Sequence, residues 1–507
     1  MRRSLRSFYR LFTIARTLAR HDALAFVEDL GIAPGLCRTL RFFSPRRKSG
    51  RPGQKLASAL TELGPSFVKL GQFLSTRADL LGEEVALDLA ELQDHLPPFP
   101  SDQARRVIER ELGQPVATLF SAFSEEAVSA ASIAQVHFAV TSEGEEVAVK
   151  ILRPQIERAF RRDLDLFYWL ANLSLRAQPR LARLKPVDLV RLFEEQVTME
   201  MDLRLEAAAA SELAENFEHD PTYVVPHVDW ERTARRVLTT TRLSGIPLDD
   251  REALLAAGHD LEEVLTRAAA TFFNQVFRDG FFHGDQHPGN MFVDSDGNIG
   301  AVDFGIMGRL DHETRMVLAD MLLAVLAKDY RRLAQVQVDA GFLPAGRPLD
   351  SYVQALRSVC EPIFGKPLAE ISFANLLTQL FQLTESFELE VQPQLTLLQK
   401  NMMMAEGVSR VLDPRLNIWS LAEPLIADWV ARNRGAPARA REGLQTLEAT
   451  LRRIPRIVEN LERATKELAN DGLRLAPQDS HRMRWSEKVA LAAAFTAAIL
   501  ALFALLD

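Results

Sequence analysis

Cysteine is the rarest residue in this 507-residue chain, which contains only Cys37 and Cys360. These two thiols lie too far apart in sequence for a metal knuckle, and they are too few for a framework of disulfides. Their scarcity predicts a protein of a reducing compartment. Hydrophobic residues make up 47% of the chain, a composition typical of a globular protein, and the length suggests about two or three domains.

An excess of positive charge is also lacking. The 60 Lys and Arg residues are outnumbered by 68 Asp and Glu residues, which gives a formal net charge of -8 at pH 7. A protein that binds the phosphate backbone of nucleic acid normally has a clear basic excess or patch. We therefore expect no nucleic-acid partner.

The N-terminal segment lacks the unbroken apolar core of a secretory signal, so we do not expect export. Residues 1–21 instead carry six arginines and no acid, with apolar side chains between the arginines. This pattern predicts a basic amphipathic helix. Two interpretations remain open, a helix on a membrane surface and a solvated helix packed on the body of the protein. A mitochondrial transit peptide has a similar composition.

Long apolar runs are absent until the C-terminal end. Residues 489–506 form an 18-residue stretch without a charge, in which Thr496 is the only polar side chain. A helix of this length reaches about 27 Å, close to the hydrocarbon thickness of a bilayer. Basic residues and Trp485 precede it, as expected at a cytoplasmic interface. The segment predicts a membrane helix, with a buried or interfacial Ala-rich helix as the alternative.

Between these ends, helical and strand-like patterns alternate. Residues 54–94 are predicted to be helical up to the prolines of "HLPPFP", and residues 132–152 to form a hairpin that turns at Ser142 to Gly144. The remaining predictions are helices over 155–217 with breaks at Pro179 and Pro186, strands at 223–230 and 235–243, helices beyond 310, a linker at 434–443 and an amphipathic helix at 445–470.

The stretch "HGDQHPGNMFVDSDGNIGAVDFG", residues 283–305, carries the clearest chemical pattern. "MFV" and "IGAV" read as two strands joined by the turn "DSDGN", and such a hairpin brings Asn290 and Asp303 together. These two side chains can share one divalent cation while Asp285 stays in the loop before them. Protein kinases divide the work in this way, with a catalytic-loop Asp at the acceptor and an Asn and an Asp on Mg2+. The turn "DSDGN" alone would indicate nothing more than a turn.

A kinase-like site also needs a lysine on an upstream strand. Lys150 ends "VAVK" on the second strand of the predicted hairpin, in a chain with only ten lysines. An acid must hold this lysine extended, and Glu206 is the predicted partner, with Glu200 and Asp202 earlier in the same segment. Glutamates on a helix surface are usually solvated, so the spacing alone leaves this pairing open.

Two parts of an ordinary protein kinase are missing. Where a Gly-rich loop should precede the lysine strand, residues 129–137 read "SAASIAQVH", without glycine, so we expect a stiffer approach to the phosphates. After Asp303 the chain enters a helical pattern within a few residues, with no long activation segment and no Ala-Pro-Glu. A kinase that docks peptides needs that platform, so we expect little ordinary protein-kinase activity.

These motifs together resemble the UbiB family of atypical kinases, the aarF-domain proteins linked to ubiquinone biosynthesis. The resemblance covers about residues 8–420 and rests on "FVKLGQFLSTRADLL", "AASIAQVH", "VAVK", "EMDLRLEAA", "HGDQHPGN" and "DFG". In that family a Lys, a Gly and a Gln on an N-terminal extension cover the active site and contact the Glu-x-Asp segment. The resemblance implies that Lys69, Gly71 and Gln72 face Glu200 and Asp202.

The resemblance also implies the other roles. Asp285, Lys150 and Glu206 would be catalytic, and Asn290 and Asp303 would hold Mg2+. The implied ATP-binding residues are Ala130, Ala131, Ser132, Lys150, Lys69, Gln72, Glu200 and Asp202.

Three features depart from the family pattern. Ser129 stands where the first of three alanines is usual, and Thr240 and Thr241 stand where Met-Glu is common at the hinge. Close bacterial relatives tend to end in two membrane helices, and this chain has room for one.

The expected fold class is α+β, a protein-kinase-like two-lobe fold with a helical N-terminal extension and a C-terminal transmembrane helix. The expected sections are a basic amphipathic segment (1–50), a helical extension with the Lys-x-Gly-Gln motif (51–125), an N-lobe with a helical insertion (126–243), a helical C-lobe (244–433), a linker with an amphipathic helix (434–488) and a membrane helix (489–506).

The resemblance implies a membrane-associated ATPase that supports ubiquinone synthesis, binds ATP with Mg2+ and presents or extracts lipid quinone precursors. Expected partners are membrane lipids, quinone intermediates and ubiquinone-biosynthesis enzymes, with a homodimer as a possibility. The expected location is the bacterial inner membrane with a cytoplasmic catalytic domain, or the mitochondrial inner membrane in a eukaryote. Two alternatives stay open, a phosphotransferase for a small molecule or protein and a non-catalytic lipid-binding scaffold.

Overall fold

The computed structural model divides the chain into two compact units, residues 1–430 and 431–507. The residues it describes all lie in the first unit: 2–23, 50–75, 81–90, 92, 97–177, 185–342, 348–364, 379, 393–416, 425 and 429. The linker, amphipathic helix and membrane helix expected beyond residue 433 lie outside them. Among the helices described, none is both long and apolar enough to cross a bilayer.

The N-terminal extension is helical, as predicted. Its helices are α1 (Arg2–Arg20), α4 (Pro52–Leu63), α5 (Pro65–Ser75) and α7 (Glu83–Ala90). The described part of residues 54–94, which were predicted to be helical, contains α4, α5 and α7. Helix α4 ends at Gly64, whose φ of +102° lies outside the helical region, and Pro65 starts α5.

Helix α1 packs on the rest of the unit. Ile14 and Ala19 are buried, and Arg10 forms a 3.0 Å ion pair with the buried Asp163. The Arg10 guanidinium also lies 5.2 Å from the centre of the Phe67 ring. For the described side chains of α1, the structure thus matches the helix packed on the body of the protein.

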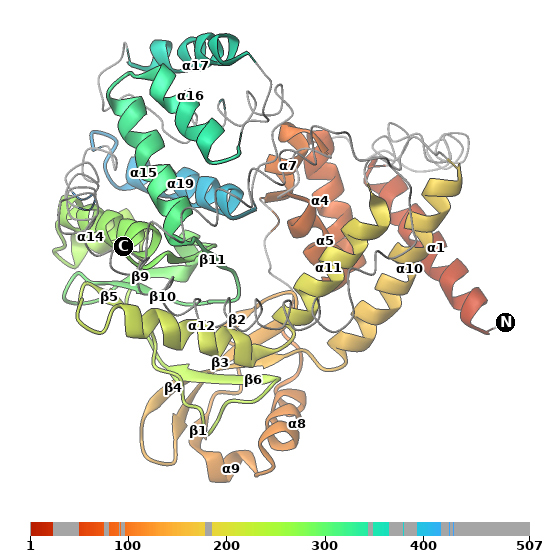
Figure 1. The fold of residues 1–507 in the computed structure, drawn as a ribbon. Helices are drawn as coiled ribbons and strands as arrows, with labels where there is room; N and C mark the ends of the chain where they lie inside the picture. Colours follow the sequence, from red (N-terminus) through yellow and green to blue (C-terminus); the bar gives the residue numbers. More distant parts are fainter. Residues whose placement is uncertain are drawn as a thin grey trace, which may run out of the picture. The chain divides into compact units, whose positions relative to one another are not determined.

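A five-stranded antiparallel sheet forms the first lobe. It contains β1 (Phe120–Phe123), β3 (Ala134–Thr141), β4 (Glu146–Leu152) and β6 (Val237–Thr241) in that order, with β2 (Ser129–Ala130) paired to β3. The predicted hairpin is β3 and β4, turning at Gly144 with φ +96°. Val149 and Ile151 pack against Val107 of α8 (Ser101–Leu112), which together with α9 (Val116–Leu119) covers this sheet (Figure 1).

The prediction of a strand over residues 223–230 is largely wrong. Only β5 (Tyr223–Val224) forms there, and Val228 makes a single bridge to Thr240. Pro226 explains the break, because proline has no N–H to donate to a sheet ladder.

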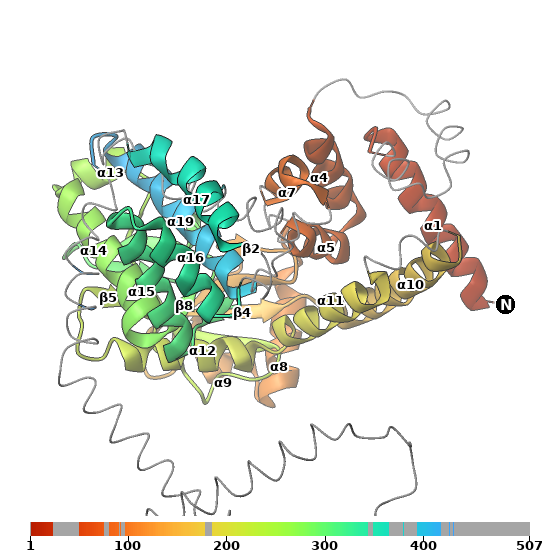
Figure 2. The same cartoon turned by 45° about the horizontal axis from the view of Figure 1, so that its top comes forward.

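Three helices come after β4, the strand that carries Lys150. They are α10 (Ile156–Ala177), α11 (Pro186–Glu200) and α12 (Leu203–Asn216). Pro186 lies in the first turn of α11, where a missing N–H costs nothing. The Phe67 ring of α5 meets the Phe167 ring of α10 edge-on at 5.2 Å, and Figure 2 shows the helical extension beside the α10 and α11 pair.

The second lobe is mostly helical around short strands. A four-stranded sheet has the order β5, β10 (Ile299–Ala301), β9 (Met291–Val293) and β7 (Ile246–Pro247), and β8 (Phe281–His283) pairs with β11 (Met307–Arg309). The helices are α13 (Arg251–Ala256), α14 (Leu261–Phe273) with a π-helical end η2 (Asn274–Asp279), the 3-10 turn η3 (Pro288–Asn290), α15 (His312–Leu326), α16 (Tyr330–Asp339), α17 (Leu349–Phe364) and α19 (Pro393–Leu412). The α+β class predicted from sequence is confirmed.

Candidate active site

Lys150 of β4 lies between two carboxylates. Its Nζ donates to both oxygens of Glu206 on α12, at 2.7 and 2.9 Å, and to Oδ1 of Asp303 at 2.9 Å. Glu206 lies one turn into α12, on its buried face. The structure thus brings together the lysine, the acid predicted to hold it and the Asp of the Asp-Phe-Gly triplet, from three separate parts of the chain.

The charges of this cluster follow from burial and proximity. Burial raises the pKa of Glu206 to about 7, against the attraction of Lys150. Burial alone would lower the pKa of Lys150 and raise that of Asp303, but their mutual attraction outweighs it, so the pKa of Lys150 is raised and that of Asp303 is lowered. At neutral pH the site therefore offers a cation for phosphate oxygens and a carboxylate for a metal ion.

The hairpin of β9 and β10 brings Asn290 and Asp303 together, as predicted. The strands pair with Met291 opposite Ala301, and the Val302 N–H donates to the Asn290 carbonyl at 2.9 Å. Asp303 has φ +64°, a left-handed conformation that few side chains adopt. Strain of this kind recurs at functional sites.

The donor set at the end of this hairpin fits Mg2+. Mg2+ prefers oxygen ligands, and proteins commonly give it one or two side chains while phosphates and water complete the octahedron. The Asn290 amide nitrogen donates to the Asp285 carbonyl at 3.2 Å, so its amide oxygen is an oxygen donor in addition to the Asp303 carboxylate.

Asp285 is fixed by a residue that the sequence analysis did not identify. Lys400, on α19, donates from Nζ to Asp285 Oδ1 at 2.8 Å. The backbone N–H of Asp285 donates to His283 Nδ1 at 3.0 Å. Burial lowers the pKa of His283, so the imidazole is neutral, and its Nε2 lies 3.2 Å from the Val302 carbonyl. His283 thereby ties the Asp285 loop to the strand that leads to Asp303.

The neighbour of Lys400 is a second residue missed from sequence. Asn401 is fully buried, donates to the His283 carbonyl at 2.6 Å and accepts from the Gln286 N–H at 3.2 Å. A polar Lys-Asn pair inside the apolar, Met-rich run "LLQKNMMM" was the only signal available. Helix α19 therefore supports the loop of Asp285 from a position 115 residues further along the chain.

The Lys-x-Gly-Gln segment lies on α5 and reaches the predicted Glu-x-Asp segment. Lys69 Nζ is 3.1 Å from Glu200 Oε2, and these side chains are only 12% and 9% exposed. The charge of Lys69 also helps to lower the pKa of Asp303. Gln72 Nε2 donates to the Leu92 carbonyl at 3.3 Å. A Cβ added at Gly71 would lie 2.4 Å from Leu92 Cδ1 and 2.8 Å from Leu60 Cδ1, so only glycine fits as packed.

Asp202 is engaged locally. It is the N-cap of α12, accepting from the Arg204 N–H at 3.2 Å, and both of its oxygens accept from the Arg204 guanidinium, at 2.8 and 2.6 Å. Of the two acids expected to face the Lys-x-Gly-Gln segment, the structure thus gives Glu200 the ion pair with Lys69 and makes Asp202 a helix cap.

The Ala-rich loop is held in place by Arg153. Ala130 ends β2, and the Ala131 carbonyl accepts two hydrogen bonds from the Arg153 guanidinium, at 3.0 and 2.8 Å. Arg153 also donates to the Pro97 carbonyl at 3.0 Å. The Ser132 hydroxyl is buried and has no hydrogen-bond partner in the described part of the chain. An orphaned hydroxyl at the tip of this loop fits a site that receives further acceptor oxygens from a ligand.

Family models match most of the described unit. The ABC1 atypical kinase-like domain matches residues 91–337, and the UbiB helical domain matches residues 356–417. The first match spans Lys150, Glu206, Asp285, Asn290 and Asp303, and the second contains Lys400 and Asn401.

Curated relatives are similar over nearly the whole chain. A "Probable protein kinase UbiB" of Marinobacter nauticus is 42% identical over 472 residues, which cover 91% of this chain and 86% of that protein. Its namesake in Azotobacter vinelandii is 40% identical over 488 residues, covering 94% and 90%. The solved Rv3197-erythromycin complex from Mycobacterium tuberculosis is 28% identical, covers 73% of this chain and 95% of that chain, and has a TM-score of 0.49. On its two family models and its relatives, this chain belongs to the ABC1/UbiB family of atypical kinase-like proteins.

Proposed function

We propose that this protein is a membrane-associated ATPase that binds ATP with Mg2+ and supports ubiquinone biosynthesis. The observation that carries the proposal is the contact of Lys150 with both Glu206 and Asp303. A partly buried lysine on a strand, held by one carboxylate on a helix and by the Asp of the Asp-Phe-Gly triplet, suits the phosphates of a nucleotide, and family membership supports the same function.

Each side chain has a distinct task in this reaction. Asn290 and Asp303 would hold Mg2+, which when bound would supply positive charge to the phosphate oxygens. Lys150 positions the phosphate oxygens once they replace Asp303 as its partner, and Glu206 keeps the lysine extended. Asp285 orients the attacking hydroxyl or water, and Lys400 holds Asp285 in place.

A peptide acceptor fits this site poorly. The Lys69 to Glu200 contact draws α5 onto the end of α11, at the Glu-x-Asp segment that precedes α12. After Gly305 the chain forms β11 and then α15, which Asp311 caps by accepting from the Thr314 N–H at 2.7 Å. This leaves only a few residues where a kinase has its peptide platform, which favours water or a small, lipid-like acceptor.

The membrane and quinone parts of the proposal rest on family and chemistry. Large apolar side chains are exposed on the helical extension and on α10, including Phe12, Trp169 and Leu173, and such side chains suit contact with lipid. We expect the ATPase cycle to present or extract hydrophobic quinone precursors for membrane enzymes. The expected location is the bacterial inner membrane, with the catalytic domain in the cytoplasm.

The test is ATP hydrolysis with and without liposomes and a quinone-head-group mimic. Asp303→Asn should abolish turnover, whereas Asp296→Asn, an exposed Asp in the turn of the same hairpin, should leave it unchanged. Equal turnover in wild type and Asp303→Asn would refute the proposal. Labelled ATP in membrane extract identifies the alternative, since a labelled product that depends on Asp285 would make the protein a phosphotransferase.

A further inference from the structure

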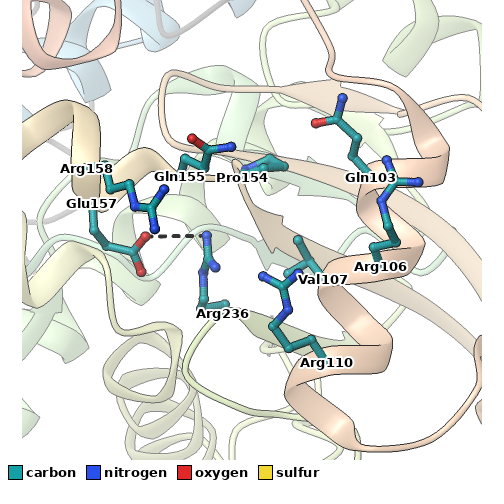
Figure 3. A pocket seen from close by; sticks show the side chains of 9 residues that line it. All are labelled: Gln103, Arg106, Val107, Arg110, Pro154, Gln155, Glu157, Arg158 and Arg236. Carbon is teal, nitrogen blue, oxygen red and sulfur yellow. Dashed lines mark ion pairs between the residues drawn. The ribbon is translucent and has the colours of Figure 1, made fainter.

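The first lobe contains an arginine-lined pocket that shares no residue with the candidate active site. It has a volume of about 480 Å³ and lies between α8, the turn after β4, the start of α10 and the residue before β6. Its charged lining is Arg106, Arg110, Arg158 and Arg236 with a single acid, Glu157. Figure 3 shows the guanidinium groups of Arg110, Arg158 and Arg236 directed toward a common space.

The positive charge of this pocket is only partly compensated. Arg106 pairs with Asp102 at 2.6 Å on its own helix, and Arg236 has a looser contact of 3.4 Å with Glu157 (Figure 3). Arg110 and Arg158 have no ion pair within the described residues. Guanidinium groups that converge without matching acids repel one another, and an anion between them removes that repulsion.

The environment of Arg236 is a second indication that the pocket binds an anion. Its side chain is only 13% exposed, and its Nε–H is buried without a hydrogen-bond partner in the described part of the chain. A buried donor with no acceptor is unfavourable. A ligand with several acceptor oxygens could accept hydrogen bonds from this donor and from the guanidinium groups of Arg110 and Arg158. Phosphate is the anion whose geometry matches several guanidinium groups at once.

We propose that this pocket is a second anion site, which binds the phosphate group of a ligand away from the candidate nucleotide site. The phosphate can belong to a soluble phosphorylated molecule or to the headgroup of an anionic lipid. Arg110 and Arg158 are exposed and bring the charge, and Arg236 provides the fixed, buried donor at the base.

Hydrogen bonds connect this pocket to the Ala-rich loop. Arg236 Nη2 donates to the Arg153 carbonyl at 3.1 Å, and the Arg153 guanidinium donates to the Ala131 carbonyl. The Arg236 carbonyl also accepts from the Leu152 N–H at 3.0 Å, two residues beyond Lys150. An anion that accepts hydrogen bonds from the Arg236 guanidinium competes for them with the Arg153 carbonyl. Its binding therefore weakens the support of the Ala-rich loop.

Pyrophosphate is the probe, and isothermal calorimetry on the full chain without Mg2+ is the measurement. Arg110→Gln/Arg158→Gln should weaken binding about tenfold or more, since it removes two charged donors. Both arginines are exposed, so the fold should survive. The charge-matched control Arg161→Gln/Arg191→Gln removes the same charge from α10 and α11 outside the pocket and should bind as wild type does. Lys150→Met should also bind normally, because it alters only the candidate nucleotide site.

The outcomes separate the possible explanations. Loss of binding in Lys150→Met alone would show that pyrophosphate binds in the nucleotide site. Equal loss of binding in the two double variants would show that binding depends only on the overall positive charge. Either result overturns the proposal. Flotation with phosphatidylcholine vesicles, with and without phosphatidylglycerol, tests the lipid source. If pyrophosphate does not bind, a loss of vesicle binding specific to the pocket variant assigns the site to a headgroup. The absence of any pocket-dependent binding in both experiments refutes the site.

Hydrogen exchange at the Ala-rich loop tests the connection without relying on the proposed ATPase activity. The Ala131 N–H donates to the Ala134 carbonyl at 2.8 Å and reports on the closed turn. In Lys150→Met, pyrophosphate should speed exchange at this amide, and adding Arg110→Gln/Arg158→Gln should remove the effect. Unchanged exchange with pyrophosphate bound would overturn the connection.

Discussion

The contact of Lys400 with Asp285 leads to the sharpest prediction, because the two residues come from different parts of the C-lobe and only the fold joins them. Their side chains are 34% and 30% exposed and meet at 2.8 Å. An ion pair exposed to this degree contributes about 1 kcal/mol or less to stability. Lys400→Met keeps the length and the apolar stem of the side chain, so we expect the melting temperature to fall by about 3 °C or less.

The effect on catalysis should be far larger. Without Lys400, Asp285 loses the partner that fixes its carboxylate. Loss of one preorganised electrostatic contact commonly costs about 10²-fold in kcat, or about 2.7 kcal/mol of barrier. We therefore expect kcat for ATP hydrolysis to fall about 10²-fold, with a smaller change in KM.

The assay pairs steady-state ATP hydrolysis with thermal unfolding. Arg410→Met is the matched control, since Arg410 lies on the same helix, is more exposed and contacts only Glu406, at 3.8 Å, among the described acids. Wild-type kcat in Lys400→Met would refute the role given to this lysine. A loss of kcat that simply follows a loss of folded protein would make the contact structural.

Four other outcomes are expected. Glu206→Gln should raise KM for ATP and lower kcat about tenfold or more, measured in the same assay, because it loosens the double hydrogen bond to Lys150. Gly71→Ala should reduce unfolding free energy by about 1–3 kcal/mol in urea, since its Cβ crowds two leucines unless they shift; Gly407→Ala, inside α19 with no atom near the added Cβ, is the control for the backbone effect of Ala at a helical glycine. Asn401→Leu should cost about 2 kcal/mol or more by urea titration, as it leaves the buried His283 carbonyl and the Gln286 N–H without partners. Burial lowers the pKa of His137, so the unfolded chain takes up the proton of this group first as pH falls below about 6.5; between pH 7.5 and 5.5 the unfolding free energy of wild type should therefore fall relative to that of His137→Gln.

The local features of the site were predictable from sequence. The hairpin of β9 and β10 follows from two short apolar runs around an Asp- and Gly-rich turn, and its closure alone brings Asn290 to Asp303. The hairpin that presents Lys150 follows from alternation around Gly144. Both features arise from interactions between residues close in sequence, where side-chain periodicity and turn chemistry decide the outcome.

The strand predicted at 223–230 shows the limit of such patterns. Its β-branched residues favour a strand, yet Pro226 removes an N–H and the neighbouring lobe offers only Ile299 and Gly300 as partners for β5. The strands available for pairing from distant parts of the sequence therefore decided how much of residues 223–230 became a strand.

The residue pattern was enough to predict the chemical groups of the candidate site: a strand lysine, a loop Asp, and an Asn and an Asp at the two ends of one hairpin. Tertiary structure alone decided which groups surround them. Lys150 meets Asp303 across 153 residues and Lys400 meets Asp285 across 115, and the arginine pocket joins α8, the start of α10 and the residue before β6. Such pairings depend on how whole helices and sheets pack, and a charged side chain at helical spacing looks the same in sequence whether it faces water or a partner from another lobe.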